Sequence, residues 1–446
     1  MLSLVLALAV SQAPTASNSR VVRVDRIPGV RTPGGRKGVR GYAFLEFAPA
    51  GGAGMGAPCA CTTPTGAKGE ALTFTRASNG TCTKTTTGGL TTTGIANGDL
   101  VTCATDQPRV EPSGGALGLR VEGARTNETL RSQEIGNVVW ATTAAGVAAP
   151  TITADFATAP DGTTTADRMQ IPACPTAGVD ASGVNQTSAT IASPSSSSVY
   201  LKANSGTPSV SVCMYGLATG TRACTQFALN TSTWTRAVVP NVTNTGGMNM
   251  EIACENRTAS YTGATNTGAA DILVWGAQSE AGAYATSYIP TTSAAVTRNA
   301  ETAYVALSSS PKATQVYSMA ATLSVFRTTA QNWQALAITT NATSPVTALY
   351  NAASTALRCE SVNGAATTAS RAAAGSFSAK RIACFNDNAN EQGVYDGTAF
   401  ATPAAGGKTG PAMNRVYLGG DPTAGFEIDG IISAVCVDPD SARCRR

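Results

Sequence analysis

The sequence contains no histidine among its 446 residues. Histidine is the side chain most often used as a general base, a proton shuttle or a metal ligand near neutral pH. Its absence excludes Ser-His-Asp and Cys-His catalysis, and it excludes zinc sites that have histidine ligands. This composition leaves catalysis by a pair of carboxylates open.

Charged residues are also scarce, because they make up 13% of the chain and leave a formal net charge of +4. A nucleic-acid-binding surface needs Lys and Arg gathered on one face, so we expect no nucleic-acid partner. Good helix formers other than Ala are few. Thr and Val favour strands, and Gly, Asn, Asp and Ser favour turns. We therefore expect an all-β protein.

The N-terminal apolar run is too short to span a bilayer. It extends from Leu2 to Val10 and is followed by the small residues Ser11 and Ala13, as in a signal peptide, although no Lys or Arg precedes it. We interpret residues 1–13 as a signal peptide and expect a secreted, cell-surface or periplasmic protein without a stable membrane span. A buried first strand or an N-terminal anchor is the alternative interpretation.

Twelve cysteines, an even number, favour structural disulfides in an oxidising compartment. Local spacing predicts four pairs and leaves a fifth, longer-range candidate, although sequence alone does not fix the connectivity. The candidate pairs are Cys82 with Cys103, Cys213 with Cys224, Cys359 with Cys384, Cys436 with Cys444, and Cys174 with Cys254. Cys59 and Cys61 are too close for an easy mutual bridge. They are the single tight pair, so we expect no cysteine metal site, which needs such pairs in fours.

The 43% hydrophobic content is enough for two or three separate cores. Short apolar runs bounded by turn residues recur through residues 131–298, as at 210–215 and 248–253. Regular strands without intervening helices predict a β-sandwich or jelly roll. A second series in residues 299–446 predicts a second sandwich, with the boundary near Arg298. Residues 14–130 are expected to form an extended, β-rich connector.

Several strings resemble one family of proteins. Thr73–Ser78, Gln107–Arg109 and Gly123–Asn127 are similar to the connector of bacteriophage tail-fibre and head-spike type structural proteins and their bacterial relatives. Ala159–Asp167, with Trp275–Gln278 and Tyr284–Thr291, extends the match. In that family these strings bracket a jelly roll like a carbohydrate-binding module.

The C-terminal strings Val416–Gly420 and Glu427–Ile432 are similar to the last strands of a laminin-G or concanavalin A-like sandwich. The resemblance covers roughly residues 72–437 and implies an architecture rather than a ligand. The signal-like N-terminus and the many cysteines favour an exported bacterial relative over a virion component.

Sugar-binding sandwiches combine a flat aromatic side chain with amide or carboxylate groups that bind hydroxyls. Three aromatic residues have polar neighbours near expected turns and are our candidate ligand-binding residues: Trp333, Tyr350 and Tyr395. Trp140, Trp234 and Trp275 are expected to be structural instead.

Paired carboxylates offer the catalytic alternative. Glu251 and Glu255 lie in one expected strand, and Glu427 and Asp429 share a strand face in another, but their spacing equally suits ordinary solvated or turn carboxylates. In the connector, Glu122 and Arg125 are expected to pair with each other or to stay solvated.

Calcium would need clustered oxygen ligands. Residues 386–388, Asn-Asp-Asn, and Asp421 supply some, but turn formation explains them more simply. We therefore assign no catalytic, metal or cofactor residue.

Three functions remain in order of preference. The first is a non-catalytic exported protein that binds a glycan or cell-surface polymer through lectin-like sandwiches. The second is a structural or assembly protein of phage descent, a homo-oligomer that would be a trimer if it is fibre-like. The third is a polysaccharide-degrading enzyme that uses a carboxylate pair.

Overall fold

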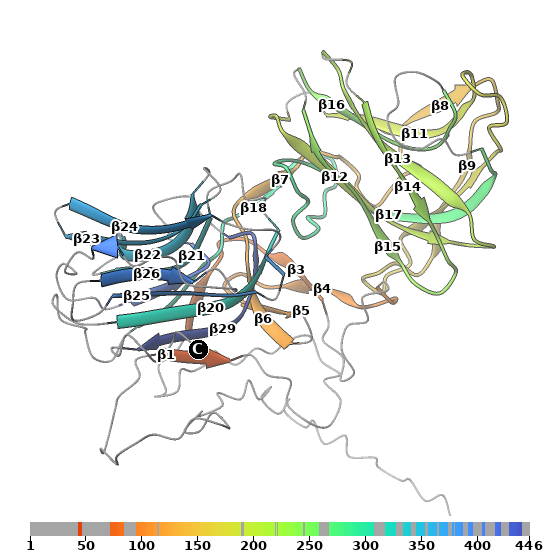
Figure 1. Ribbon diagram of the computed structural model, residues 1–446. Coiled ribbons are helices and arrows are strands. Elements are labelled where there is room, and N and C mark those ends of the chain that lie inside the picture. Colours follow the sequence, from red (N-terminus) through yellow and green to blue (C-terminus); the bar gives the residue numbers. More distant parts are fainter. Residues whose placement is uncertain are drawn as a thin grey trace, which may run out of the picture.

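The computed structural model describes residues 43–46, 72–83, 95–113, 116–188, 191–218, 220, 222–243, 246–257, 267–306, 317–326, 333–339, 345–352, 356–363, 365–372, 377–378, 380–386, 391–395, 404–405, 415–420 and 428–438. The predicted signal peptide, residues 1–13, lies outside these ranges. Within them, every helix or strand element is a β-strand, which confirms the all-β fold class. The strands form two sandwiches joined by a narrow region (Figure 1).

The first sandwich is the jelly roll, drawn mainly in yellow and green in Figure 1. One sheet has the strand order β15-β12-β17-β10-β9 and the other has the order β14-β13-β16-β11-β8, with antiparallel neighbours throughout. The first sheet consists of β9 (Thr151–Ala157), β10 (Ala166–Ile171), β12 (Ser195–Ala203), β15 (Thr235–Val242) and β17 (Ala270–Ala281). The second consists of β8 (Ala141–Ala145), β11 (Ala181–Ser188), β13 (Ser209–Gly216), β14 (Arg222–Ala228) and β16 (Met248–Glu255).

Alternation along the strands builds the jelly-roll core, because successive side chains of a strand point to opposite faces. On β16, Met248, Met250 and Ile252 are buried in the core between the sheets. Asn249 and Glu251 therefore lie on the outer face. This one strand thus supplies both an apolar inner row and a polar outer row.

The second sandwich contains strands from both ends of the chain. Its seven-stranded sheet has the order β2-β19-β28-β21-β22-β23-β24, and its other sheet has the order β27-β26-β25-β20-β29-β6-β5, with β1 also paired to β29. The first sheet consists of β2 (Leu72–Thr75), β19 (Thr302–Ala306), β21 (Trp333–Thr339), β22 (Pro345–Ala352), β23 (Ala356–Asn363), β24 (Ala365–Ala372) and β28 (Arg415–Leu418). The second consists of β1 (Ala43–Glu46), β5 (Arg109–Ser113), β6 (Ala116–Val121), β20 (Tyr317–Val325), β25 (Lys380–Asn386), β26 (Glu391–Tyr395), β27 (Ala404–Ala405) and β29 (Gly430–Asp438).

The jelly roll is an insertion within this second sandwich. Strands β2, β5 and β6 precede it in the chain. β2 pairs with β19 and β6 pairs with β29, both of which follow the jelly roll, and β5 pairs with β6 at the edge of the sheet. Figure 1 shows the orange β6 beside the blue β29. Leu72, Phe74 and Leu119 share one core with Leu418 and Ile432. The segment expected to serve only as a connector therefore also completes the C-terminal sandwich.

Two short ribbons lie between the sandwiches. In one, β7 (Arg125–Asn127) pairs with β18 (Val296–Arg298), so the chain enters and leaves the jelly roll side by side. In the other, β3 (Gly80–Thr83) pairs with β4 (Leu100–Cys103). These ribbons frame the junction.

Three of the predicted cysteine pairs form disulfides, namely Cys82–Cys103, Cys213–Cys224 and Cys359–Cys384. Cys174 and Cys254 are buried and present as thiols instead. The predicted pair Cys436–Cys444 is not described, because the structure gives only the backbone of Cys436 in β29, and Cys444, like Cys59 and Cys61, lies outside the described residues. Within the described ranges, no helix has the length and apolar character needed to cross a membrane.

Candidate functional site

Trp333 does not fit its predicted role as a ligand-stacking residue. Its side chain is fully buried in the core of the second sandwich, where its ring packs edge-on against Phe377 with a centroid distance of 4.9 Å. The polar residues before Trp333 suggested a binding loop, but Trp333 is the first residue of β21 and its side chain points into the core. A ligand could reach this ring only if the core opened.

The two predicted tyrosine sites are not brought together with Trp333. Tyr350 lies in β22, opposite Gln334 and Arg358 in register, and its side chain is outside the described part of the structure. Tyr395 ends β26 half-buried and packs on Ala320 and Ala383. Trp140, Trp234 and Trp275 are buried, as expected for structural residues.

The carboxylate pair suggested for catalysis in the second sandwich is not a site either. Asp429 is fully buried and accepts hydrogen bonds from the Gly123 amide at 2.6 Å and from the Tyr284 hydroxyl. It also contacts Arg125 at 3.4 Å. Glu427 lies outside the described residues. Asp429 therefore anchors the connector to the second sandwich.

The residues considered for calcium are largely undescribed. Asn386 ends β25, whereas Asp387, Asn388 and Asp421 lie outside the described residues. In the described part of the chain, no group of three or more His, Cys, Asp or Glu side chains is arranged to hold a metal ion.

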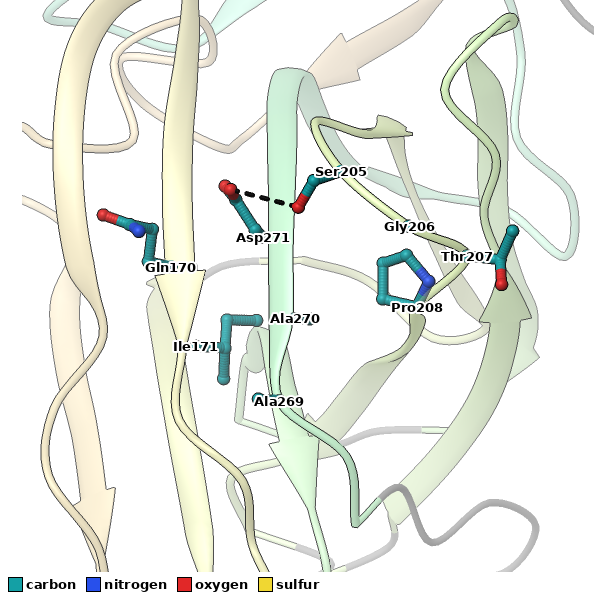
Figure 2. A pocket seen from close by; sticks show the side chains of 9 residues that line it. All are labelled: Gln170, Ile171, Ser205, Gly206, Thr207, Pro208, Ala269, Ala270 and Asp271. Atoms are coloured by element: carbon teal, nitrogen blue, oxygen red, sulfur yellow. Dashed lines mark hydrogen bonds between the residues drawn. The ribbon is translucent and has the colours of Figure 1, made fainter.

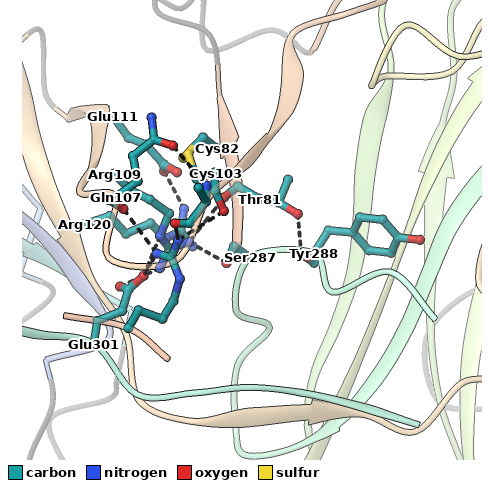
Figure 3. The surroundings of a disulfide bond; sticks show 12 residues. Thr81, Cys82, Cys103, Gln107, Arg109, Glu111, Arg120, Ser287, Tyr288 and Glu301 are labelled. Carbon is teal, nitrogen blue, oxygen red and sulfur yellow. Dashed lines mark hydrogen bonds and ion pairs between the residues drawn. A yellow bond between two sulfur atoms is a disulfide. The ribbon is translucent and has the colours of Figure 1, made fainter. Parts of the chain in front are cut away.

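Buried charges concentrate at the junction between the sandwiches (Figure 3). Arg109 is inaccessible to solvent and donates to both oxygens of Glu301, at 2.7 and 2.6 Å, and to Glu122 at 2.7 Å. It also donates to the Ser287 hydroxyl at 2.6 Å. Arg76 also contacts Glu301, at 2.7 Å. These ions join segments that lie far apart in the sequence.

Glu122 pairs with three arginines of this cluster rather than with Arg125, contrary to the sequence-based expectation. Arg120, Arg298 and Arg109 all contact its carboxylate. Burial alone would raise the pKa of Glu122, but these three charges hold that pKa well below its usual range. Glu122 is therefore ionised and structural.

A shallow hollow lies at the ends of β10 and β17 beside the loop at residues 205–208 (Figure 2). One of the polar groups that line it is Asp271, which accepts two hydrogen bonds from Arg168 at 2.8 Å and others from Asn204 and Ser205. The bonds from Arg168 lower the pKa of Asp271. Asp271 is thus an ionised carboxylate that four protein hydrogen bonds already occupy, so it fastens the loop to β17.

A different arrangement occupies the outer side of the jelly-roll sheet β14-β13-β16-β11-β8. We call it the amide face and define it by the outward residues Thr143, Asn185, Thr187, Tyr215, Asn249 and Glu251. Tyr215, Asn249 and Thr187 stand opposite one another on β13, β16 and β11. Since neighbouring strands are about 4.8 Å apart, the face across four strands is roughly 14 Å wide.

Hydrogen bonds orient the side chains of the amide face. The Asn249 amide nitrogen donates to Asn185 at 2.9 Å and to Thr187 at 3.1 Å. The Asn185 amide donates to Thr143 at 2.9 Å, and the Thr143 hydroxyl donates to Glu251 at 2.7 Å. Because each side chain is held by its neighbour, the face presents its polar groups in fixed positions.

An aromatic side chain borders these groups. Tyr215 is half-buried, and the Arg222 guanidinium lies 4.3 Å from the centre of its ring. Both side chains come from the β13–β14 hairpin, which the Cys213–Cys224 disulfide closes two residue pairs away. The disulfide fixes the hairpin, and the hairpin positions the ring.

Charges on the face are balanced. Arg257 contacts Glu251 at 2.8 Å and also contacts Glu255. Burial alone would lower the pKa of Arg257, but its hydrogen bonds and ion pairs with the two glutamates raise that pKa. With Arg222, the face thus carries two cations and two anions.

Sequence reasoning placed Glu251 in a strand but missed Tyr215, Asn185 and Asn249. Alternation along residues 248–252, with Met248, Met250 and Ile252 on one side, could have marked Asn249 and Glu251 as outward residues. No local pattern shows that Asn185, 64 positions away, lies beside Asn249.

No family model and no curated protein sequence matches the chain. Among solved structures, the tandem CBM22 domains of Paenibacillus barcinonensis Xyn10C are similar at 12% identity and a TM-score of 0.26, covering 72% of this chain and 98% of that one. Mouse laminin alpha1 domains LG4-5 match at 11% identity and a TM-score of 0.22, covering 55% and 80%. Trypanosoma rangeli sialidase matches at 11% identity and a TM-score of 0.24, covering 32% of this chain and 28% of the sialidase. At these TM-scores the likenesses carry no functional argument.

Proposed function

We propose that the protein binds an uncharged glycan on the amide face of its jelly roll. The observation that carries this proposal is the row formed by Tyr215, Asn249 and Thr187 across three strands, with the amides held in place by Asn185 and Thr143. An aromatic ring offers an apolar surface to the underside of a sugar, and amide and hydroxyl groups exchange hydrogen bonds with its hydroxyls.

The charge balance defines the class of ligand. Glu251 and Glu255 are both paired with Arg257, and Arg222 lies over Tyr215. Glu255 is fully buried, so an anionic polymer would approach the Glu251 carboxylate, and a cationic one would meet the guanidinium groups of Arg222 and Arg257. A neutral chain is not repelled by either kind of charge, and it can lie along a face that is roughly 14 Å wide.

We further propose that binding occurs without turnover. Hydrolysis of a glycosidic bond needs two carboxyl groups with different roles, one protonated and one ionised. Glu251 and Glu255 both contact the same guanidinium group, that of Arg257, so this contact does not divide them into an acid and a base. Export to an oxidising compartment is part of the same proposal and is supported by the three disulfides of the described residues.

The test is a screen of the full-length protein against neutral and charged oligosaccharides, followed by titration calorimetry with the best ligand. Tyr215→Ala and Asn249→Ala are each expected to weaken binding at least about tenfold, the loss of one good contact. Thr153→Ala, on the exposed edge strand β9, is the matched control. Equal affinity of the Tyr215 and Asn249 variants and the control would reject the amide face, and release of shorter sugars would reject the non-catalytic assignment.

A further inference from the structure

Two cysteine side chains meet in the core of the jelly roll. Cys174 lies in the segment between β10 and β11, and Cys254 lies near the end of β16. Both are fully buried and belong to the same hydrophobic cluster. The two cysteines are neighbours there, because the side chain of Asn256, two residues beyond Cys254, donates to the Cys174 carbonyl.

The backbone on each side of this contact is fixed. The Cys174 amide donates to the Thr267 carbonyl at 3.1 Å, and the Asn256 side chain donates to the Cys174 carbonyl at 2.8 Å. Asn256, two residues beyond Cys254, also accepts a bond from Gly178 at 2.7 Å. These bonds hold the 174–178 segment against the end of β16 whether or not the sulfurs are bonded.

We propose that Cys174 and Cys254 are the two halves of a further disulfide, which forms when the protein meets a disulfide-containing oxidant such as glutathione disulfide. The two thiols lose two protons and two electrons and gain one S–S bond. The oxidant accepts the electrons as its own S–S bond breaks, and it leaves as two thiols. The product closes a chain loop of about 80 residues.

The surroundings determine when this reaction takes place. Burial raises the pKa of both thiols, and the reactive thiolate is therefore scarce in the closed fold. Oxidation accompanies folding, or it follows local opening of the 174–178 segment. Once formed, the bond ties that segment to β16, the strand that carries Asn249 and Glu251.

The experiment compares full-length protein exported to a bacterial periplasm with the same chain made in a reducing cytosol. Both samples are denatured, alkylated, digested without reduction and mapped by mass spectrometry. We expect a cross-linked Cys174–Cys254 peptide in the exported protein and alkylated Cys174 and Cys254 in the cytosolic protein. Glutathione disulfide, applied near the melting temperature, should convert the second form into the first.

A stability measurement gives an independent readout. Oxidation should raise the melting temperature by roughly 5 °C, and Cys174→Ala and Cys254→Ala should show no such rise under the same treatment. If either variant fails to fold, the peptide map of the wild-type chain still shows whether Cys174 and Cys254 are cross-linked. Exported protein that retains both thiols, or that joins either one to a different cysteine, would overturn the proposal, and neither result depends on glycan binding.

Discussion

Two buried glutamates at the junction, Glu122 and Glu280, have pKa values that are shifted in opposite directions. Glu122 is buried among arginines, and its pKa is lowered. Glu280 is equally buried and accepts hydrogen bonds from Thr286, at 2.7 Å to each oxygen, but burial dominates and raises its pKa. The difference lies in the partners, because Arg125 approaches Glu280 only to 3.8 Å.

These shifts predict that the isosteric variants Glu122→Gln and Glu280→Gln change the free energy of unfolding with opposite dependence on pH. A lowered carboxyl pKa contributes stability above the unfolded-state pKa, and that stability is lost as the pH falls through the folded pKa. Glu122→Gln should therefore lower the free energy of unfolding by about 3–5 kcal/mol at pH 7, because it leaves buried arginines uncompensated. The difference in stability between the variant and the wild type should become smaller at acidic pH. Urea unfolding at neutral and acidic pH measures both values.

For Glu280 the sign reverses. A raised carboxyl pKa contributes stability below the unfolded-state pKa, and this contribution is lost as the pH rises through the folded pKa. Glu280→Gln should therefore be neutral or stabilising at pH 7, by at most about 1 kcal/mol, and should lose that advantage in acid. If both variants responded to pH alike, this account of the junction would be wrong.

At the scale of elements, the β13–β14 hairpin supports the amide face. Cys213 and Cys224 face each other directly in register, and Glu251 stands opposite Cys213 on β16. The bridge closes an 11-residue separation. It holds β14, an edge strand, against β13, and so it positions Tyr215 and Arg222.

Removing this bridge should therefore affect both stability and binding. Cys213→Ala with Cys224→Ala is expected to lower the free energy of unfolding by about 2–4 kcal/mol and to weaken glycan binding. The matched control is Cys359→Ala with Cys384→Ala, in the second sandwich, which should lower stability without changing the glycan affinity at a temperature where the protein stays folded. Calorimetry of both variants checks this, and unchanged affinity in the first would separate the hairpin from the site.

At the scale of the whole molecule, the second sandwich is built from two parts of the chain. Leu72, Leu119 and Val121 fill the same core as Val416 and Leu418. The buried cluster of Arg76, Arg109, Glu122, Arg298 and Glu301 closes the junction above that core. Neither sheet of this sandwich is complete without residues that precede the jelly roll.

A fragment of residues 299–446 should consequently fail to fold, although it matches the second sandwich expected from the sequence. It lacks β2, β5 and β6 and leaves one side of its core exposed to water. Circular dichroism and denaturant titration of this fragment, beside the full-length protein, measure the effect. A cooperative unfolding transition in the isolated fragment would contradict it.

The sequence by itself determined the features that depend on neighbouring residues. Turn residues and period-two alternation predicted the strands around Val212 and Met250, and short separations predicted Cys82–Cys103, Cys213–Cys224 and Cys359–Cys384. Composition predicted the all-β fold class, because strand and turn formers dominate the chain.

Only the tertiary structure decided which distant segments meet. Leu119 pairs with Ile432, Asn185 holds Asn249, and Glu122 receives Arg298 rather than Arg125. The direction of Trp333, inward rather than toward a ligand, was decided in the same way. The physical reason is that strand pairing and ion pairing depend on proximity in space, and the alternating pattern of a strand is the same whichever partner it finds.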